Sequence, residues 1–137
     1  MIAFKVLRTS LVGAALVSAL SVGVMSVAEA REGGGIAGSW SGGGVVVYSS
    51  GQRERAHCRA SYSGGGSTVM MSGNCATPSG SVFQSARLRQ VGANSYAGSF
   101  FNSQYNMSGT IYVTVHGSTQ SVSLRSGAGS ASLTLRH

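Results

Sequence analysis

Acidic residues are almost absent from this 137-residue chain, which contains no aspartate and only three glutamates, Glu29, Glu32 and Glu54. A glycosidase needs two carboxylates at a defined separation, and a Ser-His-Asp triad needs an acid that orients the imidazole. The chain also lacks a phosphate-binding glycine motif. These absences argue against an enzyme, and we expect no catalytic residues and no cofactor.

Motifs for metal binding are missing as well. Cys58 and Cys75 are not in Cys-x-x-Cys spacing, and the histidines at positions 57, 116 and 137 show no ligand spacing. In an oxidising compartment an isolated cysteine pair is typical of a disulfide. We therefore predict a disulfide between Cys58 and Cys75 rather than a metal or redox site, and it would stabilise the fold by about 3 kcal/mol in the chain-entropy model.

The first 30 residues have the pattern of a secretory signal peptide. Lys5 and Arg8 precede an uncharged stretch over residues 11–27, and residues 28–30 (Ala-Glu-Ala) form a small-x-small cleavage site. A transmembrane anchor is the alternative, but the apolar stretch is short and contains serines. We expect cleavage after Ala30 and a product that is periplasmic or secreted, without stable membrane insertion.

Cleavage would leave residues 31–137 strongly basic. This part contains eight arginines, no lysine, and only Glu32 and Glu54 as acids, which gives a net charge of +6 with histidine neutral. Such a surface attracts anionic partners, and we expect an anionic glycan, a lipid head group or an acidic protein. Export argues against a nucleic-acid partner, and the arginines are not interleaved with aromatic residues as in a single-strand stacking surface.

Short segments of alternating apolar and polar residues, separated by glycine and serine, predict an all-β domain. In the clearest segment, residues 105–116, Tyr105 and Val113 share one face and Tyr112 lies on the other. Further strands are expected over residues 36–48, 53–62, 67–76, 81–91 and 95–101, and two more around Val122 and Leu133.

The segments number eight, or nine if the first breaks at residues 42–44, which are all glycine. Because they follow one another through short turns, we predict a small antiparallel up-and-down β-barrel of about eight strands, in which no strand edge is exposed. A β-sandwich is the alternative. The barrel domain is expected over residues 36–137, after a flexible N-terminal segment at residues 31–35.

Alternation along residues 53–62 places the arginines of that strand on one face. Arg53, Arg55 and Arg59 form a cationic stripe, and Arg87 and Arg89 repeat the pattern on a later strand. A solvated outer face that keeps the protein soluble is one interpretation. An anion-binding surface is the other.

Glu54 lies on the opposite face of the same strand, together with Cys58, and is the candidate polar residue of the interior. If it is buried, it should be paired with an arginine or have a raised pKa. At the start of a strand it could instead be solvated or ion-paired near the mouth of the barrel. A role in ligand binding is a further alternative.

Residues 36–40, Ile-Ala-Gly-Ser-Trp, resemble the Gly-x-Trp start of calycin-type barrels such as lipocalins and avidins. The resemblance implies that Trp40 closes one end of the barrel. The order of leader, Gly-x-Trp, two cysteines and short strands is also similar to small periplasmic inhibitors of bacterial metalloproteases. Those are eight-stranded barrels whose N-terminal trunk enters the protease cleft, and residues 31–35 would be the matching trunk.

The segments around Cys58 (Cys-Arg-Ala-Ser-Tyr) and Cys75 (Asn-Cys-Ala) resemble small exported proteins of alpha-proteobacteria, a resemblance that implies no activity. We therefore expect a non-enzymatic exported β-barrel protein that binds an anionic or small apolar partner in the envelope or outside the cell. The alternative is a periplasmic protease inhibitor that acts through its N-terminal segment.

Overall fold

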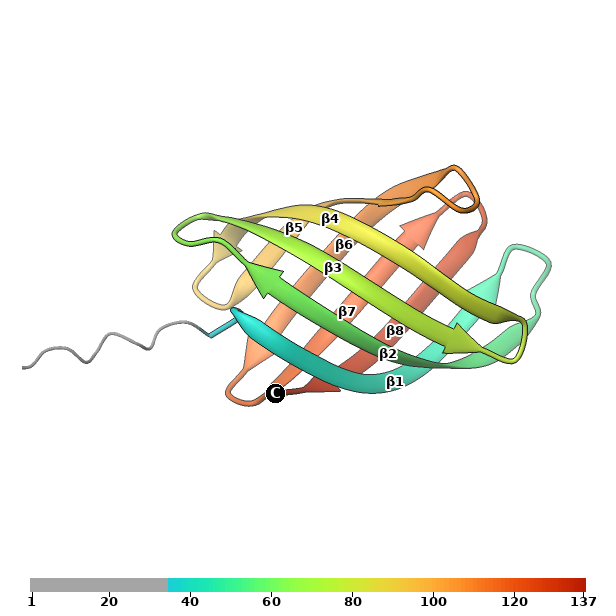
Figure 1. Cartoon of the computed structure of the whole chain (residues 1–137), viewed down its shortest axis with the longest axis horizontal. Helices are drawn as coiled ribbons and strands as arrows, with labels where there is room; N and C mark the ends of the chain where they lie inside the picture. The colour runs from blue at the N-terminus through green and yellow to red at the C-terminus, as the bar shows by residue number, and fades with distance from the viewer. Residues whose placement is uncertain (1–34) are drawn as a thin grey trace, which may run out of the picture. The chain divides into compact units, whose positions relative to one another are not determined.

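The computed structural model describes residues 35–137, in which eight antiparallel strands follow one another around a closed barrel (Figure 1). The strands are β1 (Gly38–Tyr48), β2 (Arg53–Ser63), β3 (Thr68–Thr77), β4 (Gly80–Gly92), β5 (Ser95–Asn102), β6 (Met107–His116), β7 (Thr119–Ser126) and β8 (Gly129–Arg136). The predicted signal peptide, residues 1–30, and all but Gly35 of the N-terminal segment lie outside the described residues.

Each strand pairs with the next one along the chain, and β1 also pairs with β8, so that the sheet closes on itself. The predicted up-and-down barrel is therefore confirmed, and the sandwich alternative is wrong because a single sheet forms the whole wall. Within residues 35–137 no helix is long and apolar enough to span a membrane.

β1 runs without interruption through its three central glycines, so the alternative of a break at residues 42–44 does not apply. Two of these glycines let β8 approach closely. A Cβ built on Gly44 would lie 1.9 Å from the backbone oxygen of Ser132, and one on Gly42 would lie 2.2 Å from that of Thr134. The glycines thus serve close strand packing within a continuous strand, a use of glycine that is typical of small barrels.

Alternation along the strands places apolar side chains inside, as the sequence predicted. On β6 the side chains of Ile111, Val113 and Val115 are buried. Tyr105 does not belong to this face, which corrects the prediction. It lies in the turn between β5 and β6 and is 60% exposed, because β5 continues to Asn102 and β6 begins only at Met107.

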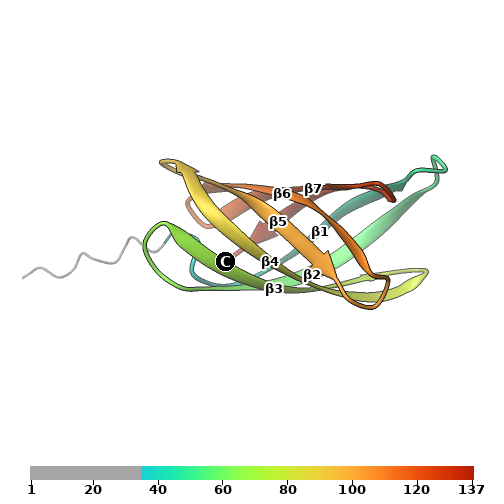
Figure 2. The same ribbon diagram turned by 90° about the horizontal axis from the view of Figure 1, so that it is seen from above.

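The two ends of the barrel are built from different connections (Figure 1; Figure 2). The start of β1 and the end of β8 lie at one end, called here the Trp40 end. The four turns at residues 49–52, 78–79, 103–106 and 127–128 lie at the other end, called here the mouth.

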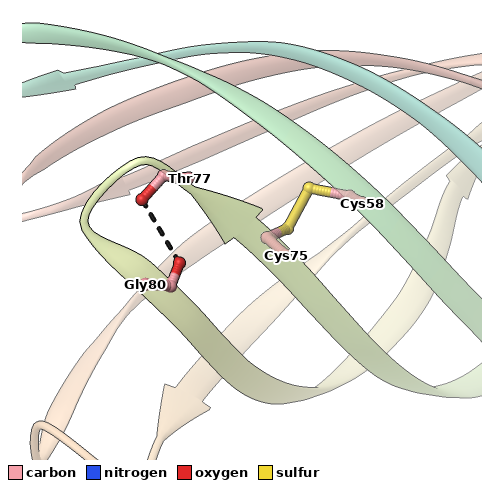
Figure 3. Close-up of a disulfide and its surroundings, with 4 residues drawn as sticks. All are labelled: Cys58, Cys75, Thr77 and Gly80. Atoms are coloured by element: carbon pink, nitrogen blue, oxygen red, sulfur yellow. Dashed lines mark hydrogen bonds between the residues drawn. A yellow bond between two sulfur atoms is a disulfide. The ribbon is translucent and has the colours of Figure 1, made fainter.

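The disulfide joins directly opposite residues of neighbouring strands (Figure 3). Cys58 on β2 is the register partner of Cys75 on β3, with a Cα–Cα distance of 4.1 Å. Both side chains belong to the inner face, where Cys58 is buried and Cys75 packs against the core. The predicted pairing is confirmed, and it links two adjacent strands of the barrel wall.

Candidate functional site

A cavity of about 760 Å³ occupies the mouth half of the barrel. Its floor contains Phe100, Leu124 and Leu133, which belong to the core cluster. Residues on all eight strands and on all four mouth turns line it: Val46, Tyr48, Gln52, Ala56, Cys75, Thr77, Ser79, Gly80, Val82, Gln84, Phe100, Asn102, Tyr105, Asn106, Met107, Leu124, Arg125, Ser126, Gly127, Ala128, Gly129, Ser130, Ala131 and Leu133.

Side-chain size explains why the cavity lies at this end. Inner positions of the mouth half include small residues such as Ala56, Ala131 and Gly129. Inner positions nearer the other end include Trp40 and Tyr62, which fill the interior and are almost fully buried. The same alternating pattern therefore gives a packed core at one end and an open space at the other.

Trp40 lies at the end opposite the mouth and is 2% exposed. Its indole Nε1–H donates a hydrogen bond to the carbonyl oxygen of Ile36 over 2.9 Å. Its ring packs edge-on against the ring of His137, with 4.6 Å between the centroids. The two ends of the barrel chain, the start of β1 and the residue after β8, thus meet at this tryptophan.

Asn102 is a buried polar side chain in the cavity wall, with an exposed fraction of 0%. Its Oδ1 accepts a hydrogen bond from the backbone N–H of Tyr105 over 3.3 Å, whereas Nδ2 has no hydrogen-bond partner. An unsatisfied buried donor costs about 1–3 kcal/mol. The sequence analysis missed Asn102, which continues the inward alternation of Tyr96 and Phe100 just beyond the expected end of that strand.

Glu54 is held at the rim of the mouth by two hydroxyl groups. Its Oε1 accepts a hydrogen bond from the Tyr48 hydroxyl over 2.8 Å, and its Oε2 accepts one from the Ser79 hydroxyl over 2.5 Å. The bond from Ser79, followed by that from Tyr48, holds the pKa of the carboxyl below its usual value. The sequence analysis expected an arginine partner or a raised pKa only for a buried Glu54, with a place near the mouth of the barrel as the alternative. In the structure the carboxylate is half-buried at the mouth, and its partners are hydroxyl groups.

These two hydroxyl groups belong to residues that line the cavity, although Glu54 itself does not. Tyr48 occupies the last position of β1, and Ser79 lies in the turn between β3 and β4. Because both hydroxyl hydrogens are used in bonds to the carboxylate, a ligand could meet these oxygens only as hydrogen-bond acceptors. Hydrogen bonding to Glu54 also raises the pKa of the Tyr48 phenol, which keeps it protonated.

The five arginines singled out from the sequence are all exposed on the outer face. None of them lines the cavity. They form two groups. The first group lies along β2 and consists of Arg53, Arg55 and Arg59. The second group lies on β4, where Arg87 is the register partner of Met70 and Arg89 that of Thr68 on β3. No single site collects them.

Two further arginines, Arg136 and Arg125, were not among the residues predicted from the sequence. Arg136 on β8 and Arg59 on β2 are both register partners of Ser41, so the two strands flank β1 with a cation on each side. Arg125 lies near the end of β7 and is the single arginine that lines the cavity of the described barrel. Its side chain is exposed at an outward position of β7, next to the inward Leu124, so the guanidinium belongs to the outer face of the barrel.

A second buried amide lies away from the cavity. Gln120 accepts a hydrogen bond from the Tyr62 hydroxyl over 2.7 Å, and its Nε2 has no partner. Burial raises the pKa of Tyr62 well above its usual value. Among residues 35–137 no three His, Cys, Asp or Glu side chains are grouped so that they could hold a metal ion.

Comparisons with known proteins define the fold and nothing finer. No protein-family model and no curated protein matches the chain. Among solved structures, a redesigned β-barrel, mFAP1, bound to DFHBI, is similar with a TM-score of 0.63 and 9% identity, over 74% of this chain and 94% of that one. A de novo designed fluorescence-activating β-barrel is similar with a TM-score of 0.58 and 12% identity, over 75% of this chain and 94% of that one.

Proposed function

We propose that this protein is an exported, non-enzymatic binding barrel that takes a small, largely apolar molecule into the cavity at its mouth. The observation that carries the proposal is the cavity itself. Its volume of about 760 Å³ is in the range of ligand pockets. Its floor is apolar, and a buried amide donor and two hydroxyl oxygens supply a small number of polar contacts. Mostly apolar walls with few polar groups are typical of small-molecule sites.

Export is supported by the leader sequence and by the disulfide between Cys58 and Cys75, since such bonds form in oxidising compartments. The similar barrel mFAP1 is bound to DFHBI. From it we take only that a barrel of this fold accepts a ligand. We also propose that an anionic surface or partner would bind the outside of the barrel, where all seven arginines of residues 35–137 are exposed.

The test uses the mature chain, residues 31–137, and the uncharged fluorescent probe N-phenyl-1-naphthylamine. We expect saturable binding with one probe per barrel. Ala131→Phe places a ring in the cavity and should raise the Kd about tenfold or more, which corresponds to a loss of at least ~1.4 kcal/mol.

Ser132→Phe is the matched control, because Ser132 is the next residue on β8, faces outward and does not line the cavity. It should bind the probe as the unsubstituted chain does. Circular dichroism would verify that both variants are folded. Non-saturable binding, or equal affinity in the Ala131→Phe variant, would remove the proposal.

A further inference from the structure

We propose that the cavity selects an uncharged, mostly apolar carbonyl compound that carries a hydroxyl or N–H group at its opposite end. This inference rests on the proposed binding function and names the ligand class of the same site. It follows from the placement of donors, acceptors and apolar side chains in the cavity.

The donor side of the cavity is the side-chain amide of Asn102. Because Oδ1 accepts the backbone N–H of Tyr105, the orientation of the amide is fixed, and Nδ2 is the atom left without a partner. Nδ2 is a hydrogen-bond donor only. Nδ2 has almost no accessible surface, so a ligand reaches it only when a neighbouring side chain of the cavity wall shifts. A carbonyl oxygen would then satisfy it, and a ligand N–H or O–H group would not.

The acceptor side is formed by the Tyr48 and Ser79 hydroxyl oxygens. Their hydrogens are used in the bonds to Glu54, at 2.8 Å and 2.5 Å, so that each oxygen can only accept from a ligand. Tyr48 ends β1, and Asn102 ends β5. The two oxygens lie beside the Glu54 carboxylate, at β2 and the turn between β3 and β4, two to three strands away from β5 around the barrel. A ligand that satisfies both sides therefore has an acceptor at one end and a donor at the other.

The apolar floor of the cavity favours an uncharged ligand. The Glu54 carboxylate lies behind Tyr48 and Ser79 and is already bonded to their hydroxyl groups, and the exposed Arg125 side chain belongs to the outer face of β7. Below the rim the lining is apolar apart from the buried donor amide and the half-buried amide of Gln84, and an ion there would lose its hydration without a charged partner.

The experiment compares three probes that share a naphthalene ring. 6-Acetyl-2-naphthol has both the carbonyl and the hydroxyl, 2-acetylnaphthalene lacks the hydroxyl, and 2-naphthol lacks the carbonyl. Calorimetric titration of residues 31–137 should give the tightest binding for 6-acetyl-2-naphthol. Asn102→Leu should weaken binding of the two acetyl probes about fivefold, the value of one neutral hydrogen bond, and leave 2-naphthol unchanged.

Gln120→Leu is the matched control, because it removes the other unpartnered buried amide at a position that does not line the cavity. It should leave all three affinities unchanged. Asn102→Asp is the second variant if Asn102→Leu does not fold, measured at a pH above the pKa of the new carboxyl, where the ionised group accepts from the Tyr105 N–H and has no donor. It should discriminate against the acetyl probes in the same way.

The outcomes separate this inference from the function on which it rests. Equal effects of the Asn102 variants on all three probes, or no effect on any, would overturn the inference while binding itself stands. Failure of these probes and of N-phenyl-1-naphthylamine to bind the unsubstituted chain would overturn the proposed function.

Discussion

At the scale of single residues, two polar side chains at the mouth differ in how their hydrogen bonds are satisfied. The Glu54 carboxylate accepts from two hydroxyl groups, whereas the Asn102 amide uses its oxygen and keeps its nitrogen free. A satisfied carboxylate contributes to stability in its charged form. A buried donor without a partner lowers stability, and under the proposed function a ligand would supply the missing hydrogen bond to Asn102.

The pH dependence of stability should reveal the bonds to Glu54. Since its folded-state pKa lies below the usual value of 4.5, the charged form stabilises the fold. This contribution is fully present above the unfolded pKa and is lost as the pH falls through the lowered folded pKa. Glu54→Gln should therefore lower the melting temperature at neutral pH, and the difference from the unsubstituted chain should shrink in acid. Thermal unfolding followed by circular dichroism from pH 7 to about pH 2 measures this. A difference that is constant or grows toward acid would be inconsistent with it.

Alternation predicted the inward face of Glu54, but not its partners. Tyr48 comes from the end of β1 and Ser79 from the turn after β3, and their approach to β2 depends on strand register, which the sequence does not reveal. Asn102 was missed for a simpler reason. It lies one residue beyond the predicted strand end at Phe101, where alternation no longer assigns a direction to the side chain.

At the scale of elements, most strands agree with the predicted segments because each carries a clear inner and outer face. The turn between β5 and β6 shows where alternation alone fails. The sequence continues the pattern back to Tyr105, but Asn106 adopts a left-handed conformation with φ of 51° and ends the extended backbone there. Asparagine tolerates this conformation better than most residues. Asn106 was therefore a sequence signal for a turn, but the alternating pattern that continues back to Tyr105 hid it.

The glycines of β1 allow the barrel to close against β8, and this leads to a prediction. Gly44→Ala should lower the free energy of unfolding by about 1–3 kcal/mol, as is typical of an overpacked site, because the added Cβ would lie 1.9 Å from the Ser132 backbone oxygen. Gly127→Ala in the turn after β7 is the control, since a Cβ there meets nothing within 4 Å. Urea unfolding of both variants tests the difference. Equal stability of the two would show that β1 and β8 are not closely packed at this point.

At the scale of the whole molecule, the barrel combines a filled half and an open half in one sheet. Short turns and alternation were enough to predict the barrel, whose closure is completed by the pairing of β1 with β8. They were not enough to predict the cavity. The position of the cavity depends on which inner residues of different strands lie at the same level along the barrel axis. Only the strand register shows that small residues such as Ala56 and Ala131 lie together at the mouth.

The similar designed barrels share the fold at 9–12% identity, so they show that very different sequences build this wall. What distinguishes this chain is the content of its interior. The outer face carries the arginines, the Trp40 end is packed, and the mouth holds the few polar groups that face the cavity. The proposed function therefore depends on the mouth half and not on the fold as such.

The most direct test of the mouth cavity as the binding site is an NMR titration of residues 31–137 with N-phenyl-1-naphthylamine. The largest shifts are expected for backbone amides of lining residues at the mouth, such as Thr77, Gly80 and Gly129. The indole N–H of Trp40, which bonds to Ile36 at the opposite end, should not move. Shifts centred on Trp40 or on the outer arginines, with the mouth unchanged, would contradict the account.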